Sequence, residues 1–367
     1  MAQIKDTLQT NAIRKCSPVM YINSNNLIEE AGKHIISLGN KALISSGHRA
    51  WDAVKEKLTS SLNKSGIKSD LNLFIGNCCD TNISIIKEKA KHMKANVIIG
   101  IGGGKSLDAA KAAADDINLP IVCIPTIAAT CAAVTALSVI YNDEGIYQRA
   151  WWLKVNPNLV LVDPIVITSA PVIYTQSGIM DAISKWIEGQ VAAKVVKDMD
   201  IFNYTALSIA ELLYKNLLLK GPKAIESINI NESDKNLIDV IDLAIYFAGI
   251  IQALGPDLAR GGIAHAVYTG LTIDEENRKL LHGILVGYGI MIQLILENKT
   301  DKELPEILSF YKKINFIPSL KNLNIKLNKD KINKLAEKTC AHGYMQVLQI
   351  KKEMIIDAVE KLEELMS

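Results

Sequence analysis

The sequence predicts an α/β domain followed by an all-helical domain, a Rossmann-like arrangement with helices added. Short apolar runs rich in β-branched residues alternate with helical patterns through the first half of the chain, which indicates βαβ units and a mostly parallel sheet. From about residue 168 onward, long helical patterns replace the strand patterns. A chain of 367 residues is also too long for one ordinary core. We therefore expect two domains, residues 1–165 and 166–367, with a cleft between them.

The individual elements follow from the period of the apolar residues. Strands are expected at 19–22, 42–45, 71–75, 97–101, 120–124 and 159–162, with helices at 27–38, 50–62, 82–94 and 106–115. In the second domain, helices are expected at 179–192, 198–218, 233–253, 258–271, 277–297, 302–313, 328–341 and 350–365. A loop containing Gly221-Pro222 and the Asn-rich stretch 228–234 should separate some of these helices.

The composition excludes several classes of protein. The net charge is only +2, so no large basic field for nucleic acid is expected. Residues 1–16 lack the apolar stretch of a signal peptide, and the longest uninterrupted apolar run, 284–292, is too short to span a membrane. The six cysteines form no C-x-x-C pair, which is typical of free thiols in a reducing compartment. We expect a cytoplasmic protein without nucleic-acid or membrane partners.

The stretch GIGGGKSLDAAK at 100–111 has the physical properties of an anion-binding turn. It lies between a predicted strand that ends at Ile101 and a helix expected to begin at Ser106, and the N-terminus of such a helix offers free N–H groups. The triphosphate-loop pattern fails because Ile99 replaces its first glycine, and the dinucleotide pattern fails because Lys105 replaces its third. The residues alone leave two readings open, a phosphate-binding turn and a plain tight turn.

Three residues have the chemistry of a metal site. Asp181 lies on an otherwise apolar helical turn, and His265 and His282 lie 17 residues apart with a predicted turn, DEEN, between them. One carboxylate and two imidazoles would bind zinc or iron and leave a position open. Spacing alone equally allows buried core histidines and a simple pair of Asp181 with Lys185 at i+4.

Three segments in order resemble the iron-containing (group III) alcohol dehydrogenase family, in its glycerol dehydrogenase-like branch. They are GGGKSLDAAK at 102–111, PIVCIPTIAATCAAVTALSVIY at 120–141 and SGIMDAISKW at 177–186. The resemblance covers nearly the whole chain. It implies the group III alcohol dehydrogenase fold, shared with dehydroquinate synthase. It also implies a nicotinamide cofactor, NAD or NADP, bound by the first domain, one divalent metal, zinc or iron, in the helical catalytic domain, and a homo-oligomer.

The resemblance also assigns residues to roles. The metal ligands, which act in catalysis through the metal, are Asp181, His265 and His282. The substrate pocket includes Cys131 and Tyr268. The cofactor-binding residues are Ser46, Gly103, Gly104, Lys105, Ser106, Asp108, Thr126, Thr135, Leu137 and Tyr141.

The chain departs from the family pattern at three places that bear on specificity. Cys131 replaces an aspartate that is usual in glycerol dehydrogenases. With this cysteine, the TCAA loop resembles that of the hydroxycarboxylate dehydrogenase subgroup. Tyr268 replaces the second histidine of the family's H-A-x-H pattern. After the strand 42–45 the chain reads SSGHR, without the acid that NAD-preferring relatives carry, so we predict that NADP is tolerated or preferred.

The predicted function is a metal-dependent, NAD(P)-linked dehydrogenase that interconverts a small polyol or hydroxy acid with its ketone or 2-oxo form. Two alternatives on the same fold are an sn-glycerol-1-phosphate dehydrogenase and a dehydroquinate synthase-like lyase. The first usually carries a His-Asp in the loop where this chain has Thr130-Cys131. A third alternative, from a different class, is a non-catalytic nucleotide-binding protein.

Overall fold

The computed structural model describes residues 14–259, 262–326 and 328–367. The chain divides into two compact units, one of residues up to 175 together with 226–253, the other of residues 176–225 and 254–367. The helical segment 226–253 thus groups with the α/β unit, whereas the predicted second domain, 166–367, includes it. Two expectations concern residues that lie partly outside the described ranges. The expected absence of a signal peptide concerns residues 1–16, of which 1–13 are not described, and the predicted helix 258–271 includes residues 260 and 261.

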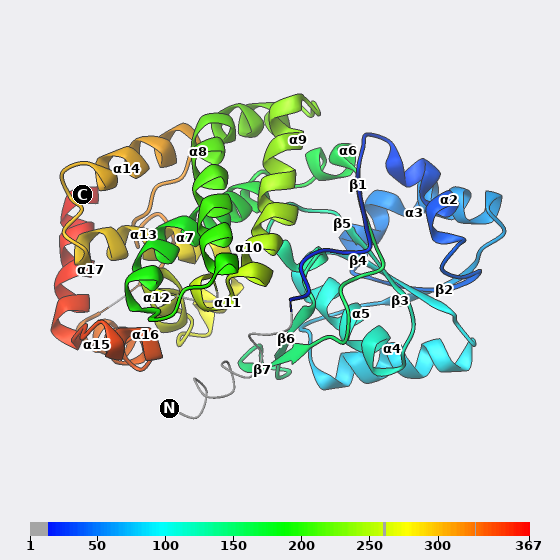
Figure 1. Ribbon diagram of the computed structural model, residues 1–367, viewed down its shortest axis with the longest axis horizontal. Coiled ribbons are helices and arrows are strands. Elements are labelled where there is room, and N and C mark those ends of the chain that lie inside the picture. Colours follow the sequence, from blue (N-terminus) through cyan, green and yellow to red (C-terminus); the bar gives the residue numbers. More distant parts are fainter. Residues whose placement is uncertain (1–13, 260–261, 327) are drawn as a thin grey trace. The chain divides into compact units, whose positions relative to one another are not determined.

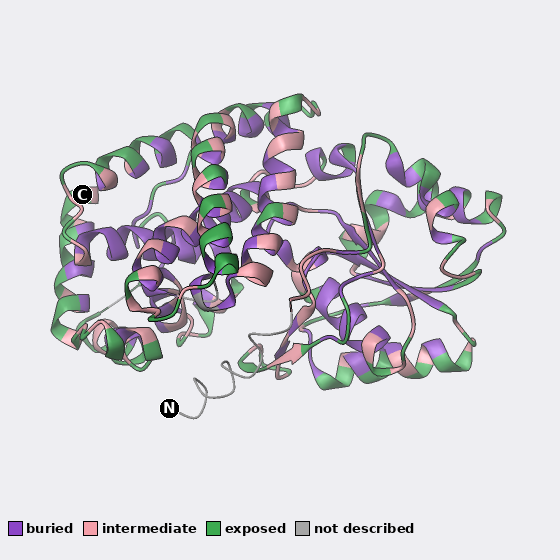
Figure 2. Cartoon of the chain, in the orientation of Figure 1, coloured by how far each residue is buried: buried purple, intermediate pink, exposed green. Residues whose placement is uncertain are grey.

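A six-stranded parallel sheet forms the centre of the first unit (Figure 1). The predicted parallel sheet is confirmed, and its central strands are buried, as the colours of Figure 2 show. Its order is β1-β8-β5-β4-β2-β3, with β1 (Met20–Asn23), β8 (Leu159–Val162), β5 (Ile121–Pro125), β4 (Val97–Gly102), β2 (Lys41–Ser46) and β3 (Lys68–Leu73).

Helices cover both faces of this sheet. In Figure 1, α2 and α3 lie on one side of the strands, and α4 and α5 lie on the other. The first unit contains η1 (Leu27–Glu30), α2 (Ala31–Ile35), α3 (His48–Lys64), α4 (Asp80–His92), α5 (Gly104–Asp116) and α6 (Pro164–Thr168). Two predictions need correction. The expected helix 27–38 is a 3-10 turn followed by a short helix, and the helix expected from Ser106 begins at Gly104, because Gly103 adopts the extended N-cap conformation.

An antiparallel hairpin was not predicted. Strands β6 (Leu137–Tyr141) and β7 (Tyr147–Trp152) follow a short 3-10 turn, η2 (Cys131–Ala133), and form a separate two-stranded sheet. The register shifts at Ile140/Tyr141. β7 is largely exposed, and Arg149 interrupts its apolar residues, so the segment lacks the buried apolar run that marks a parallel strand.

The helical segment Lys235–Leu254 is long and apolar enough to cross a membrane, by length and composition only, and half of its apolar window is buried inside the protein. It comprises α9 (Lys235–Asp242), a π-helical turn η3 (Leu243–Phe247) and α10 (Ala248–Leu254). Asp242 accepts hydrogen bonds from Tyr21 and Asn23 of the edge strand β1, both at 2.7 Å. These contacts are typical of a core helix of the α/β unit.

The second unit is built of helices, and its described residues contain no strand, as predicted. Figure 1 shows α12 and α13 close together in this unit, and they pack against each other. The helices are α7 (Ile173–Val195), α8 (Ile201–Asn229), α11 (Pro256–Ala259), α12 (Ile263–Leu271), η4 (Glu276–Lys279), α13 (His282–Leu296), α14 (Glu303–Lys313), α15 (Lys329–Cys340), α16 (Gly343–Val347) and α17 (Lys352–Met366).

The predicted loop at Gly221-Pro222 is wrong, because both residues lie inside α8. Proline lacks the N–H that would continue the helical ladder, so local propensity favours a break here. Tertiary packing prevails over it. A Cβ added at Gly221 would lie 3.2 Å from the ring of Phe310, so α8 needs a residue without a side chain where it passes α14.

Candidate functional site

The structure brings Asp181, His265 and His282 together in the second unit. One possible ligand atom from each lies within 4.8 Å of the other two. The Oδ1 atom of Asp181 is 3.6 Å from Nε2 of His265 and 3.5 Å from Nε2 of His282. Asp181 is buried, and its Oδ1 has no hydrogen-bond partner. A buried carboxylate oxygen that faces two imidazole nitrogens is the arrangement that a cation would complete.

Three helices supply these side chains. Asp181 lies in the middle of α7, His265 in the first turn of α12, and His282 is the first residue of α13. Gly283 lets α13 begin directly against α7, since a Cβ there would lie 1.8 Å from the carbonyl oxygen of Ser177. The N–H of Gly283 also donates to Ser177 Oγ at 3.0 Å. This close approach places His282 beside Asp181.

Glu188 is a site residue that sequence reasoning missed. It lies on α7 seven residues after Asp181 and is 2 % exposed. Its Oε2 lies 2.6 Å from Nδ1 of His265, and its Oε1 accepts the backbone N–H of the same histidine at 2.9 Å. Positions i, i+4 and i+7 share one helix face, so the acids at 181 and 188 on an apolar helix were a usable signal.

Charges around the cluster control its ionisation. Burial opposes the charge on Asp181, but the nearby Lys185 ammonium and the imidazoles of His265 and His282 prevail and hold its pKa well below the usual range. Burial likewise opposes the charge on Glu188, but His265 keeps its pKa lowered. For His265 burial disfavours the cation, but the two carboxylates raise its pKa to about 9. An incoming metal ion must therefore displace a proton from His265.

The donor set fits a single divalent metal. A metal about 2.0–2.1 Å from each of its ligands in tetrahedral geometry separates those ligand atoms by roughly 3.3 Å. The two separations of 3.5 and 3.6 Å are close to this value. Three protein ligands would leave a fourth position, and Tyr268 packs edge-to-face against His282, at 4.4 Å between ring centres.

The predicted cofactor residues gather in the first unit at the carboxyl ends of three neighbouring strands. Ser46 ends β2, Gly103 follows β4, and Thr126 follows β5 and donates its N–H to the carbonyl oxygen of Gly102 at 3.2 Å. Gly102 has φ +132°, which favours glycine at this turn. Parallel sheets bind ligands at this edge.

The N-terminus of α5 is open to an anion. Its N-cap, Gly103, contributes no side-chain hydrogen bond, and Gly104 begins the helix. Lys105 reaches Asn77 Oδ1 at 2.7 Å, and burial lowers the pKa of its ammonium. The Ser106 hydroxyl donates to the carbonyl of Ile101 at 2.8 Å, so it stabilises the turn itself. Backbone N–H groups and the helix dipole are the anion-binding elements that remain.

The segment 130–141 supplies the other predicted contacts. Thr135 is buried, whereas Leu137 and Tyr141, the ends of β6, are partly exposed. Asp108, also predicted to contact the cofactor, is buried and engaged internally: its Oδ1 lies 2.9 Å from the Lys111 ammonium, and its Oδ2 accepts the N–H of Val139 at 3.0 Å. Its position thus favours a structural role.

The two predicted substrate-pocket residues belong to different units, and their meeting in one pocket stays a prediction. Cys131 is 7 % exposed, and its thiol donates to Gln252 Oε1 at 3.4 Å. Gln252, on α10, was not identified from the sequence. Tyr268 is largely buried beside His282, and burial raises the pKa of its phenol, with a further contribution from the charge of Asp181.

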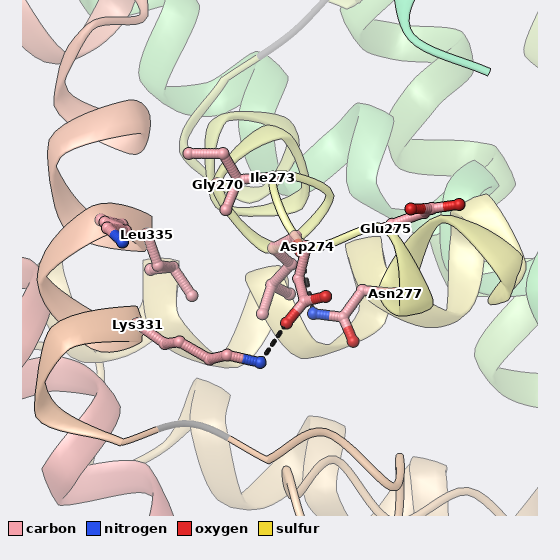
Figure 3. A pocket seen from close by; sticks show the side chains of 9 residues that line it. Gly270, Ile273, Asp274, Glu275, Asn277, Lys331 and Leu335 are labelled. Atoms are coloured by element: carbon pink, nitrogen blue, oxygen red, sulfur yellow. Dashed lines mark hydrogen bonds and ion pairs between the residues drawn. The ribbon is translucent and has the colours of Figure 1, made fainter. Parts of the chain in front are cut away.

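A surface pocket of about 310 Å³ in the second unit is separate from this cluster. Figure 3 shows Lys331 reaching Asp274 across it. None of Asp181, His265 and His282 lines this pocket. Its lining residues are Gly270, Leu271, Ile273, Asp274, Glu275, Asn277, Lys331, Lys334 and Leu335.

Comparisons with known proteins agree with the fold. A family model described as iron-containing alcohol dehydrogenase matches residues 18–164. The chain is 31% identical to a glycerol dehydrogenase of Pseudomonas putida over 89% of this chain and 90% of that protein. It is 34% identical to hydroxycarboxylate dehydrogenase A of Escherichia coli over 77% of each. A probable glycerol dehydrogenase of Sinorhizobium meliloti superposes with a TM-score of 0.82, at 27% identity, over 95% of this chain and 97% of that one.

Proposed function

The chain belongs to the iron-containing alcohol dehydrogenase family, and on that premise we propose how its residues carry out the reaction. It is an oxidoreductase that acts on CH–OH groups and depends on a metal and a nicotinamide cofactor. The proposed reaction interconverts a small polyol or hydroxy acid with its ketone or 2-oxo form. The matches do not favour the alternatives on this fold, the sn-glycerol-1-phosphate dehydrogenase and the dehydroquinate synthase-like lyase, or a non-catalytic nucleotide-binding protein.

The observation that carries the proposal is the cluster of Asp181, His265 and His282, with the orphaned carboxylate oxygen of the buried Asp181. These residues would hold one zinc or iron ion. A metal held there supplies a Lewis acid that polarises the substrate's oxygen. Glu188 accepts the Nδ1 proton of His265 and so leaves its Nε2 free to face the cluster. Tyr268 closes one side of the open position.

The first unit would bind the cofactor. The N-terminus of α5 would receive the pyrophosphate, and the segment 130–141 would line the nicotinamide ring, which when bound supplies hydride-transfer chemistry. The chain's part in this transfer is to orient the ring and exclude water.

Two features support finer assignments. At position 131 a thiol donates to Gln252, so no negative charge from this side chain would repel a substrate carboxylate, which favours hydroxy acids over plain polyols. At the end of β2, helix α3 begins with His48 and Arg49 and has no acid in its first turn. A 2′-phosphate would meet a helix N-terminus and a cation there, so NADP is accepted alongside NAD. We place the enzyme in the cytoplasm as a homo-oligomer.

The test is an anaerobic NAD(P)H-oxidation screen with dihydroxyacetone, simple aldehydes and several 2-oxo acids. Each carbonyl is tested with and without a chelator, then with zinc or iron restored. Chelator-sensitive turnover of 2-oxo acids is the expected result. Turnover of dihydroxyacetone alone would refute the assignment to Cys131, and no turnover of any carbonyl would refute the proposed function. A kcat/KM far higher with NADH than with NADPH would contradict the assignment to His48 and Arg49.

A further inference from the structure

We propose that Lys111, with Asp108 as its counter-ion, is a positioning residue that holds the segment 130–141 in its cofactor-binding conformation. The proposal rests on the proposed function, because it takes this segment to be the nicotinamide side of the cofactor site. Neither residue needs to contact the cofactor for this role.

Lys111 is a fully buried cation in the third turn of α5. Its ammonium donates to the carbonyl oxygen of Ala132 at 2.7 Å, to that of Thr135 at 3.2 Å, and to that of Leu137. An ammonium has three donors, so these three carbonyls use its full capacity. The three carbonyls lie in η2, in the stretch that connects η2 with β6, and at the first residue of β6.

Asp108, one turn earlier on α5, extends the same attachment. Its carboxylate lies 2.9 Å from the Lys111 ammonium and also accepts the N–H of Val139 at 3.0 Å. Its backbone carbonyl accepts the Ser138 hydroxyl at 2.8 Å. The pair therefore holds the segment on both sides of Leu137, which is one of the predicted cofactor contacts.

The physical reason for a charged residue lies in the irregular backbone of this segment. Ala132 lies in a short 3-10 turn, Thr135 in the irregular backbone after it and Leu137 at the first residue of β6, so regular secondary structure alone does not provide partners for these carbonyls. A buried cation is stable only while its acceptors remain in place, because an unpaired charge in the interior is strongly unfavourable. Displacement of the segment would expose or orphan the ammonium, so the segment is ordered before a cofactor arrives. Such preorganisation lowers the entropy lost on binding.

The position of Lys111 on α5 links two parts of the proposed cofactor site. The N-terminus of α5, at Gly104, faces the place of the pyrophosphate, and Lys111 two turns later holds the segment that would line the nicotinamide ring. One rigid helix thus sets the spacing between the two ends of the cofactor.

The experiment compares Lys111→Met, which keeps an unbranched side chain one atom shorter and removes its charge, with Leu58→Ala. Leu58 is fully buried in the core of the same unit and has no part in the proposed site. NADH and NADPH affinities are measured by fluorescence titration on the full-length protein, with melting temperature and metal content measured in parallel. Lys111→Met is expected to raise the cofactor Kd by about tenfold or more, because three carbonyls and a carboxylate lose their partner, and to leave metal content unchanged. Leu58→Ala should lower the melting temperature and leave the Kd within about twofold.

The outcomes separate the two proposals. Wild-type protein that binds neither NADH nor NADPH would refute the proposed function, and the cofactor role of Lys111 with it. Wild-type binding together with an unchanged Kd in Lys111→Met would overturn only the positioning role. If Lys111→Met does not fold, the double variant Lys111→Met/Asp108→Asn removes both buried charges, and hydrogen exchange then reports on the segment. Lost protection of the Val139 amide with a raised Kd supports the proposal, whereas retained protection and affinity overturn it.

Discussion

Replacing Glu188 with glutamine is expected to weaken metal binding by about 10- to 100-fold, although no ligand is removed. The wild-type carboxylate accepts two hydrogen bonds from His265, one from its backbone N–H at 2.9 Å and one from its ring Nδ1 at 2.6 Å. A glutamine has one acceptor oxygen. If that oxygen keeps the backbone N–H, its NH₂ group faces Nδ1 and favours the tautomer with the proton on Nε2. That nitrogen is the one that must face the metal.

The expected magnitude follows from two independent considerations. Outer hydrogen-bond partners of metal ligands contribute about 10- to 100-fold in affinity, which corresponds to about 1.4–2.8 kcal/mol. A hydrogen bond to a charged, buried carboxylate contributes about 1.5–3 kcal/mol. Glu188 is 2 % exposed, so solvent does not screen the interaction with His265.

The assay is competition with a metal-binding dye, which measures the zinc Kd without any turnover. Glu363→Gln is the matched control, because Glu363 is an acid of the same unit that accepts the N–H of Leu320 at 3.0 Å and is not one of the three cluster residues. The control should keep the wild-type Kd. Equal zinc affinity in Glu188→Gln and wild type would refute the idea that Glu188 sets the tautomer of His265.

Three further predictions concern other parts of the molecule. Gly283→Ala should lower metal content and melting temperature together, since its Cβ would meet the Ser177 carbonyl at 1.8 Å and displace α13; elemental analysis that finds full metal occupancy would contradict this. Asp242→Asn should stabilise the protein at pH 7, because burial raises the pKa of Asp242 and Asn keeps an oxygen that accepts the Tyr21 hydroxyl. Since the pKa of Asp242 is higher in the folded than in the unfolded state, this gain in stability should disappear below about pH 4. Urea titrations at both pH values measure the difference. Cys123 is fully buried, and burial raises the pKa of its thiol to about 12, so iodoacetamide at pH 8 should label it only after unfolding. Mass spectrometry of native protein treated with iodoacetamide measures this, and a labelled Cys123 there would contradict the prediction.

Much of the fold could be predicted because its signals are local. The strand 159–162 was predicted at its observed bounds, since a parallel strand buried on both faces is a continuous apolar run. The hairpin 137–152 was missed because its outer strand is exposed and carries no such run. Gly221-Pro222 was misjudged because local propensity favours a break there, whereas in the folded chain both residues lie inside α8 and Gly221 lies close to the distant Phe310 ring.

The sequence by itself, through its family resemblance, determined the candidate residues for the chemistry: a glycine turn before a helix, and an acid and two histidines whose side chains favour a divalent metal. Only the tertiary structure decided what supports them. Glu188 reaches His265 across 77 positions of sequence, and Lys111 reaches three carbonyls that lie 21 to 26 residues away. Local patterns report which face of a helix is buried, because burial follows the helical period. They do not report which distant backbone atom that face will meet, since this depends on how the helices pack.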